Sequence, residues 1–529
     1  MPTKPQSTAS NANEGARLSW GDALFLYLER AGMPLIIASV SIFEGDIELE
    51  ACRRYIESKL PLLPRYRQHA LAPPFNVGLP SWEEDSEFDI RNHIKERHLK
   101  QGTEAELQAV AGEILSTVMD RSHPLWDITL LHGLKGDRMG MLVRVHHCLA
   151  DGVAGVALVN VLFDASPKVR PISRSKKKHP VKRQRDSLTL LLEGCISSCT
   201  DVLNRAVTAQ DALVNALGST VATGLPSANA ASFLPELTAP TQRLFFNQVY
   251  KGPQAFAWTQ IPTDDIKTIR RSCGGTHNDV VLALMTATMR RYAERHGDHV
   301  KGRLFRMMVP VNVRVDDATE MGNRILFLPV TVPLDVTNSR KLLESVNQRT
   351  EYLKRTHLAE WLGLAATVIG VVPPSIQALL GPLASMLPLA LCNMICTNIR
   401  GPEGPLYLLG HKMTDWYPYV PIGGEMTLNC AILSYRGITY FGFSGDTSAA
   451  TDMHELPGLL QQSARELLKA AGASISKAKK PRRKAAQKTV AATADEVLPA
   501  EGTSAIKAAT TNRRRFENAH VMATSSAAD

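Results

Sequence analysis

The sequence predicts an α/β protein of two domains, each with a mixed sheet of strands flanked by helices. Its 529 residues are 44% hydrophobic and 21% charged, which is typical of a globular chain with more than one domain. Segments with strand and helix patterns alternate in two long blocks. A basic, proline-containing segment separates the blocks, and we interpret it as a linker.

The first block begins at Leu18, after a polar stretch. Runs of β-branched residues that end at turn residues indicate strands, and apolar residues at helical spacing indicate helices. Thr103 precedes the clearest helix and is a favourable N-cap residue. The predicted elements are a strand at 34–45, a helix in 49–68 broken by prolines, a helix at 103–120, strands at 125–134 and 139–147, and a buried helix at 153–164.

The second block runs from about Arg243 to Ala471. It has strand patterns at 305–315, 325–336, 426–435 and 438–446, and helix patterns at 277–296 and 342–357. Between the blocks, residues 187–221 have a moderately helical pattern, and the Pro/Ala/Ser-rich residues 222–242 predict a loop.

These patterns divide the chain into five parts. We predict a disordered N-terminus at 1–17, an N-terminal domain at 18–165, a basic linker with a connecting helix at 166–242, a C-terminal domain at 243–471, and a disordered basic tail at 472–529.

The positive charge of the chain is concentrated outside the two blocks. Lys and Arg number 60 against 51 Asp and Glu, a net charge of +9. Residues 166–185 carry nine Lys or Arg and no acid, and residues 472–529 carry eleven against five acids. The rest of the chain is therefore mildly acidic. This distribution disfavours a nucleic-acid partner and fits solvated linkers or peripheral contact with an anionic surface.

Cysteine usage and the N-terminus predict an intracellular protein. Eight cysteines in this length, with no CxxC pair, are too few for a disulfide scaffold. The first residues are polar and lack the apolar core of a signal peptide. We expect a cytoplasmic protein.

One group of residues stands out as a candidate site. An apolar strand ends in His146 and His147, and Asp151 and Gly152 follow before an apolar helix, in the pattern HHxxxDG. A hydroxyl nucleophile needs a base at neutral pH, and imidazole suits that work. Consecutive strand residues point to opposite faces, so one ring can face a cavity while the other packs or bonds behind it. Gly152 suits the turn that follows.

Other interpretations of this group remain open. A single histidine at a strand end is usually a satisfied structural residue, but four residues in this spacing seldom occur by chance. A metal site is disfavoured because neighbouring residues on opposite faces are poor co-ligands. Asp151 either orients an imidazole or holds the loop by pairing with a cation such as Arg144; we favour the structural role.

Further segments carry a resemblance to a known family. They are LSWGDALFLYLE (18–29), Pro124-Leu125-Trp126, Asn278-Asp279, VPVNVR (309–314), Gly322-Asn323 and TNIRGP (397–402). The segment HHCLADG resembles the active-site motif of chloramphenicol-acetyltransferase-like acyltransferases, which include the condensation enzymes of peptide synthesis. More narrowly, residues 18–470 are similar to the bacterial wax ester synthase/diacylglycerol acyltransferase family. Thr397 and Arg400 depart from the family's SNVPGP segment.

The resemblance implies a fold and a reaction. The fold would be two chloramphenicol-acetyltransferase-like domains with a tunnel between them. His147 would be the general base that deprotonates a diacylglycerol or a fatty alcohol for attack on long-chain acyl-CoA. No covalent acyl-enzyme and no cofactor are implied, because acyl-CoA is a substrate. Asp151 would be structural.

The second domain contributes one candidate to the site. We hypothesise that the Asn278 amide donates a hydrogen bond to the developing oxyanion. Asn278-Asp279 is equally well interpreted as a helix N-cap pair, and Trp126 is expected to pack in the core.

An uncharged segment at 361–399 contains no Asp, Glu, Lys or Arg. Prolines split it into pieces too short to span a bilayer comfortably, so we expect short apolar helices that dock on the core or dip into a lipid surface. The expected location is the cytoplasm, with peripheral contact to the inner membrane or to lipid inclusions. The rival functions are an acyltransferase of this fold for a polyketide or sterol hydroxyl, and a non-catalytic coat protein of lipid inclusions.

Overall fold

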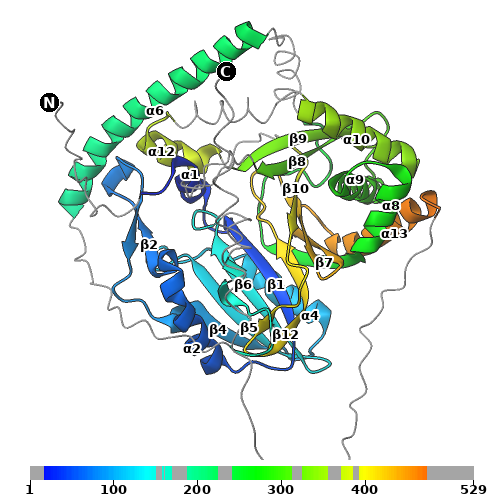
Figure 1. Cartoon of the computed structure of the whole chain (residues 1–529), viewed down its shortest axis with the longest axis horizontal. Coiled ribbons are helices and arrows are strands. Elements are labelled where there is room, and N and C mark those ends of the chain that lie inside the picture. The colour runs from blue at the N-terminus through cyan, green and yellow to red at the C-terminus, as the bar shows by residue number, and fades with distance from the viewer. Residues whose placement is uncertain are drawn as a thin grey trace, which may run out of the picture. The chain divides into compact units, whose positions relative to one another are not determined.

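The structure is a computed structural model of the chain. It describes residues 17–150, 158–159, 161–169, 187–223, 241–312, 325–355, 371–384 and 392–472. All of these residues belong to one compact unit. Within it, the strands form two six-stranded sheets and one two-stranded sheet (Figure 1).

The first sheet has the strand order β11-β12-β1-β6-β5-β4. Its strands are β1 (Ile36–Glu44), β4 (Ile94–His98), β5 (Trp126–Leu134), β6 (Arg138–His146), β11 (Tyr407–Leu408) and β12 (His411–Tyr419). The pairs are antiparallel except for β4 with β5, which is parallel. The sheet is therefore mixed, as the sequence predicts.

The second sheet has the order β7-β14-β13-β10-β8-β9. Its strands are β7 (Gln254–Pro262), β8 (Leu304–Asn312), β9 (Ile325–Pro333), β10 (Met394–Arg400), β13 (Leu428–Tyr435) and β14 (Ile438–Asp446). β10 runs parallel to both of its neighbours, and the other pairs are antiparallel. The separate hairpin pairs β2 (Gln68–Leu71) with β3 (Ser81–Glu84).

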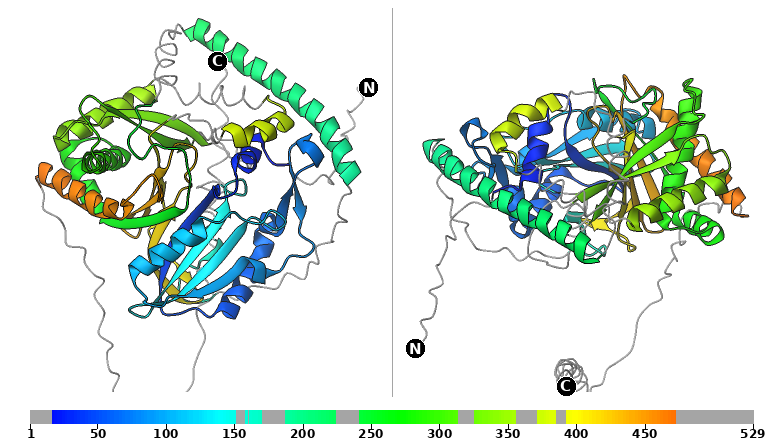
Figure 2. Two further views of the ribbon diagram at one scale, coloured as in Figure 1. Left: turned by 180° about the vertical axis from the view of Figure 1, so that it is seen from behind. Right: turned by 90° about the horizontal axis from the view of Figure 1, so that it is seen from above.

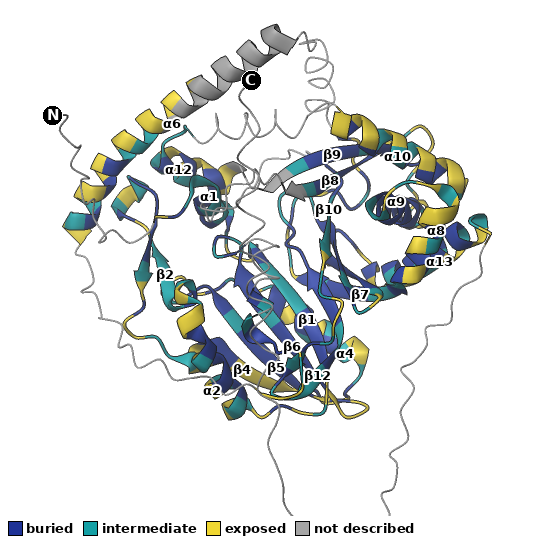
Figure 3. Cartoon of the chain, viewed as in Figure 1, coloured by how far each residue is buried: buried dark blue, intermediate teal, exposed yellow. Residues whose placement is uncertain are grey.

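The helices flank the sheets. They are α1 (Trp20–Leu28), α2 (Leu49–Lys59), α3 (Ile90–His93), α4 (Glu104–Leu115), α6 (Ser187–Thr223), α8 (Thr263–Cys273), α9 (His277–Arg295), α10 (Ser339–Arg355), α12 (Pro374–Ala384) and α13 (Leu456–Ala470). Short 3-10 turns lie at η1 (Leu60–Leu62), η2 (Pro64–Arg67), η3 (Pro74–Asn76) and η4 (Met453–Glu455). Most of α9 is buried, and α8, α10 and α13 pack against it (Figure 3).

Local chemistry explains where the clearest helix begins and ends. The Thr103 hydroxyl accepts from the Glu106 N–H, as the sequence predicts for an N-cap. The helix ends at Leu115, before the predicted 120, because hydroxyls compete for the last carbonyl groups. Ser116 Oγ donates to Gly112 O at 2.7 Å, and Thr117 Oγ1 donates to Ile114 O at 2.7 Å.

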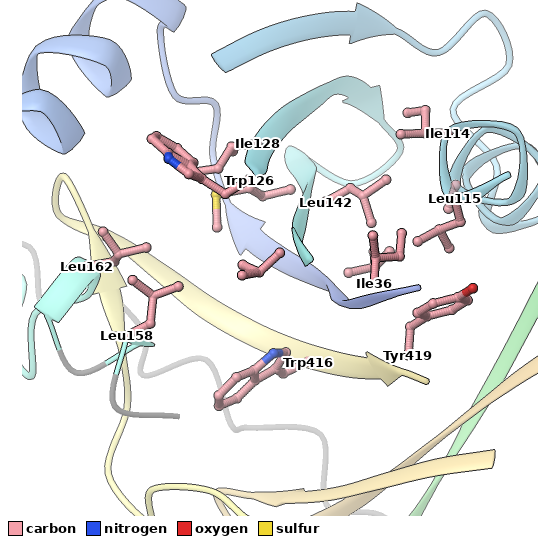
Figure 4. Packing of buried hydrophobic residues seen from close by; sticks show 14 of the residues in the cluster. Ile36, Ile114, Leu115, Trp126, Ile128, Leu142, Leu158, Leu162, Trp416 and Tyr419 are labelled. Carbon is pink, nitrogen blue, oxygen red and sulfur yellow. The ribbon is translucent and has the colours of Figure 1, made fainter. Parts of the chain in front are cut away.

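Side chains from distant parts of the sequence build the core of the first sheet. Figure 4 shows Ile36 of β1, Leu115 of α4, Trp126 of β5 and Tyr419 of β12 in this cluster. All four are buried. Helix α4 also packs on β7 of the second sheet, and Trp258 Nε1 there donates to Glu104 Oε1 at 2.7 Å. The two sheets are thus joined by direct contacts.

One segment that the sequence assigns to the C-terminal domain belongs to the first sheet in the structure. Residues 407–419 lie inside the C-terminal domain predicted at 243–471, but in the structure they form β11 and β12 of the first sheet. The reason is that the alternation of buried residues in a strand identifies a strand but not its partner.

Several predictions fall partly or wholly on undescribed residues. The connecting helix is present as α6, whereas the basic part of the linker at 170–186, the loop at 224–240 and the tail from 473 lie outside the described residues. Of the helix predicted at 153–164, residues 158–159 and 161–162 are described as helical.

The described parts of the uncharged segment 361–399 form one helix and one strand. Residues 374–384 form α12, whereas residues from 394 onward form β10, whose Met394 and Cys396 are buried in the core. The expected short helix is confirmed at 374–384, whereas the expectation of helices is wrong for residues 394–399, whose apolar side chains pack in the core as part of a strand. Among the residues that the structure describes, no helix combines the length and the apolar character needed to cross a bilayer.

Gly442 of β14 lets the two sheets approach closely. A Cβ atom at this position would lie 1.9 Å from the carbonyl oxygen of Pro418 in β12. Because this neighbour is backbone, it cannot move away without disturbing the strand that completes the first sheet.

We expect Gly442→Ala to lower the free energy of unfolding by about 3 kcal/mol, since the added methyl group forces the sheets apart. The measurement is urea unfolding followed by circular dichroism. Gly458→Ala in α13 is the matched control, because its Cβ would meet nothing within 4 Å. An equal loss of stability in both variants would contradict this role for Gly442.

Candidate active site

The two adjacent histidines lie at the end of β6, in different environments. His146 is the last residue of the strand and is 0% exposed, whereas His147 begins the following turn and is partly exposed. The strand alternation predicts that the two residues differ: His146 is fully enclosed, whereas His147 is largely enclosed but keeps partial exposure.

Both nitrogens of the buried His146 ring face a partner. Nδ1 accepts the Cys148 N–H at 3.1 Å, and Nε2 lies 3.3 Å from Glu29 Oε1. The backbone is held as well, because the His146 N–H donates to Leu125 O at 2.9 Å. These contacts hold the turn at residues 146–149, here called the histidine turn, which contains His147.

The His147 ring stacks against the first helix, α1. It stacks on Phe25 of α1 with 3.9 Å between ring centroids and 9° between ring planes. Its backbone N–H donates to Leu35 O at 2.9 Å. Burial lowers the pKa of His147 to about 4; a hydrogen bond with its own backbone acts in the opposite direction, and the neighbouring His146 lowers the pKa further. The ring is therefore neutral near pH 7, which is the form that accepts a proton.

Arg144 anchors the same strand to its neighbours. Its Nε donates to Asp127 Oδ1 at 2.9 Å, its Nη2 pairs with Asp127 Oδ2, and Nη1 donates to Thr117 O at 2.9 Å. The guanidinium of Arg144 thus joins β5 and the end of α4, and Asp127 is its anionic partner.

The Pro124-Leu125-Trp126 segment is part of the frame of the histidine turn. Leu125 is buried and supplies the carbonyl group that accepts from His146. Trp126 is buried, as predicted, and its Nε1 donates to Tyr66 O at 2.8 Å. The segment therefore fixes the backbone of β6 at the end that carries the histidines.

The Asn278-Asp279 pair opens α9, and its two members have different roles. Asp279 forms a capping box with Thr276, whose hydroxyl accepts from the Asp279 N–H, and Asp279 Oδ1 accepts from Thr350 at 2.7 Å. The capping interpretation is thus confirmed for Asp279. Asn278 instead accepts at its Oδ1 from Asn398 Nδ2, at 3.2 Å. This contact joins two of the motifs seen in the sequence, 278–279 and 397–402.

The structure describes only some of the remaining candidate residues. Asp151 and Gly152 lie outside the described residues, so their roles stay predictions. Cys148 is buried beside the histidines, and burial raises the pKa of its thiol well above the usual value. A neutral, enclosed thiol is a poor nucleophile.

The structure adds residues that the sequence alone did not assign. Phe25 and Glu29, in the opening segment 18–29, contact His147 and His146, and Arg121 donates to Glu29 Oε2 at 2.9 Å. The sequence does hold a signal for these two residues, because segment 18–29 is one of the motifs that carry the family resemblance. No spacing rule, however, connects residue 29 with residue 146.

Two family models match the chain. The wax ester synthase/diacylglycerol acyltransferase catalytic domain matches residues 18–281, and the WS/DGAT C-terminal domain matches residues 321–468. The chain belongs to the wax ester synthase/diacylglycerol acyltransferase family. It is an acyltransferase, and the resemblance carried by its motifs is confirmed.

Individual relatives agree with this assignment. A probable diacylglycerol O-acyltransferase of Mycobacterium tuberculosis is 26% identical over 470 residues, covering 88% of this chain and 97% of the relative. The O-acyltransferase WSD of Acinetobacter baylyi is 28% identical over 447 residues, covering 82% and 93%. Among solved structures, the wax ester synthase/diacylglycerol acyltransferase from Marinobacter aquaeolei VT8 has a TM-score of 0.60 at 21% identity, covering 86% of this chain and 100% of that chain. This last likeness confirms the predicted α/β fold, and the tunnel between the domains stays a prediction.

The lowered pKa of His147 predicts a pH-dependent stability. Between about pH 4 and the usual histidine pKa near 6.5, the unfolded chain binds a proton at this residue and the folded chain does not. The free energy of unfolding should therefore fall by up to about 1.4 kcal/mol per pH unit as the pH drops through this window. Urea unfolding between pH 7 and pH 5, with His147→Gln as reference, measures this slope. Equal slopes in both proteins would contradict it.

Proposed function

We propose that this chain transfers a long-chain acyl group from acyl-CoA to the hydroxyl group of a diacylglycerol or a long-chain alcohol. The products are triacylglycerol or wax ester, and free CoA. The proposal is supported by membership of the family together with one observation, the neutral and rigidly held imidazole of His147 at the end of β6.

His147 acts as the general base in a single displacement. It accepts the proton of the acceptor hydroxyl while the hydroxyl oxygen forms a bond to the thioester carbonyl carbon. The carbon–sulfur bond then breaks, and the proton passes from His147 to the departing thiolate. No covalent acyl-enzyme is required, because the acceptor attacks directly.

Asn278 is the proposed donor to the oxyanion that develops on the carbonyl oxygen. Its Oδ1 accepts from Asn398, which sets the orientation of the amide and leaves the Nδ2 group as the donor for a ligand. Asn398 lies on β10 and Asn278 on α9, so the second sheet and its central helix together support this group.

The base is tested by an assay with labelled palmitoyl-CoA and either dioleoylglycerol or hexadecanol. We expect His147→Ala to lower kcat by about 10²- to 10⁴-fold, because the hydroxyl then loses its proton acceptor. His296→Ala is the matched control: the His296 ring stacks on Phe245 at 4.2 Å and 9°, far along the chain from the histidine turn. Equal turnover in His147→Ala and wild type would remove the proposed base, and turnover of neither acceptor by the wild type would favour the rival alcohols.

A second part of the proposal concerns where these water-insoluble acceptors are met. We assign contact with an anionic lipid surface to a group of exposed apolar side chains, here called the apolar surface. Its members are Phe75 in η3, Leu188, Leu192, Ile196, Leu203 and Val207 on α6, and Ile376, Leu379, Leu380 and Leu383 on α12.

The three elements of the apolar surface are neighbours. η3 contacts both α6 and α12. A Cβ on Gly194 of α6 would lie 2.9 Å from the Val77 side chain, directly after η3. Phe75 is 85% exposed and has φ of 57°, a conformation that bulky residues rarely adopt and that here keeps the ring in solvent. Exposed apolar groups in such number are characteristic of interaction sites.

Charge and position both favour lipid as the partner. The nine Lys and Arg of residues 166–185 directly precede α6 in the chain, and each cation near an anionic bilayer contributes about 1 kcal/mol. Helix α12 packs on α1, where a Cβ on Gly381 would lie 2.5 Å from Tyr27 O (Figure 2). Helix α1 also carries Phe25, which stacks on His147. The apolar surface and the proposed base therefore both contact α1.

Sedimentation with vesicles of phosphatidylcholine, with and without phosphatidylserine, tests the apolar surface. We expect Leu379→Ser with Leu383→Ser to weaken vesicle binding about ten-fold or more, because two exposed leucines no longer enter the lipid. Leu62→Ser in η1 is the control, since this leucine is equally exposed but lies outside the apolar surface. Unchanged binding by the double variant would contradict the assignment.

A further inference from the structure

Glu29 is a buried carboxylate that the proposed reaction does not itself use. It follows the last residue of α1, and its side chain is 1% exposed. Removing a carboxylate from water is costly unless partners replace the water. Here Oε1 accepts from the Leu35 N–H at 3.0 Å, and Oε2 accepts from Arg121 Nη2 at 2.9 Å.

The third partner of the carboxylate is the buried histidine. Oε1 of Glu29 lies 3.3 Å from His146 Nε2. Nδ1 of His146 accepts the Cys148 N–H, so Nε2 is the ring nitrogen that faces Glu29. Burial acts to raise the pKa of Glu29, but His146, Leu35 and Arg121 together hold it below the usual value. The carboxylate is thus charged and oriented.

The Leu35 peptide connects Glu29 to the second histidine. The Leu35 N–H donates to Glu29, and the Leu35 carbonyl accepts from the His147 N–H at 2.9 Å. The carboxylate therefore contacts the histidine turn by two routes, through the His146 ring and through the Leu35 peptide. Phe25, one helical turn before Glu29, supplies the ring against which His147 stacks.

We propose that Glu29 is a positioning residue for the base. It holds the His146 ring and the Leu35 peptide, and these set the position of the His147 imidazole. Arg121 completes the arrangement, because the same Nη2 that binds Glu29 also donates to Leu26 O at 2.8 Å and so fastens the end of α1. The proposal rests on the proposed role of His147 as base.

The test is Glu29→Gln, which keeps the size of the side chain and an acceptor for the Leu35 N–H but removes the charge that faces His146 and Arg121. Displacing the base lowers the rate of the reaction but leaves substrate binding unchanged. A shift of about 1 Å is enough to lower rates by about 100-fold. We expect kcat to fall by about 10- to 100-fold, with KM for palmitoyl-CoA unchanged. Binding stoichiometry for palmitoyl-CoA corrects kcat for any unfolded protein.

Glu425→Gln is the matched control. Glu425 is also a buried carboxylate paired with an arginine, and its oxygens lie 3.0 Å and 3.1 Å from Arg243 nitrogens. We expect a similar shift in melting temperature for the two variants but unchanged kcat for Glu425→Gln. An equal, small effect of both changes on kcat would overturn the positioning role.

A double-variant cycle separates positioning from general stability. If Glu29 acts through His146, adding Glu29→Gln to His146→Ala should lower kcat no further than the more severe single change. Losses that multiply would overturn the proposal. If Glu29→Gln gives no folded protein, Arg121→Gln replaces it, because the Arg121 side chain is 45% exposed, and the same loss of kcat is expected.

The same data separate this proposal from the proposed function. Loss of turnover in His147→Ala but not in Glu29→Gln rejects only the positioning role. Full turnover in both variants rejects His147 as the base.

Discussion

Strand β1 is hydrogen-bonded along its length to β6 on one side and to β12 on the other, and the position of the site depends on this register. Ile36 pairs with His146, so Leu35 lies where its carbonyl can accept from His147. A shift of one residue would turn every side chain of β6 to the opposite face. The buried histidine would then be exposed, and the accessible one would be enclosed.

The histidine turn is held by groups from two segments that both precede it in the sequence. The opening helix contributes Phe25 and Glu29, and the segment before β5 contributes Arg121 and the Leu125 carbonyl. These contacts restrict the backbone and both rings. If His147 is the proposed base, a side chain held in this way needs little reorganisation when a substrate arrives.

The same opening helix has a second neighbour in α12. One face of α1 therefore belongs to the interior that holds His147, and another supports a helix with four exposed apolar side chains. This arrangement gives a physical reason for the dense, apolar character of residues 18–29. Helix α1 packs against the histidines on one face and against α12 on another, so its sequence is constrained on both faces.

By itself, the sequence determined the class of fold, about half of the described strands and helices, and the position of a candidate site at 146–147, because these depend on local periodicity and on motifs that are continuous in the chain. It also indicated that the two rings differ, since strand alternation is local. Only the tertiary structure decided that residues 407–419 complete the first sheet, that Asp127 pairs with Arg144, and that Asn278 contacts Asn398. Pairing partners and buried ion pairs are contacts between distant residues, and their geometry exists only once the chain has packed.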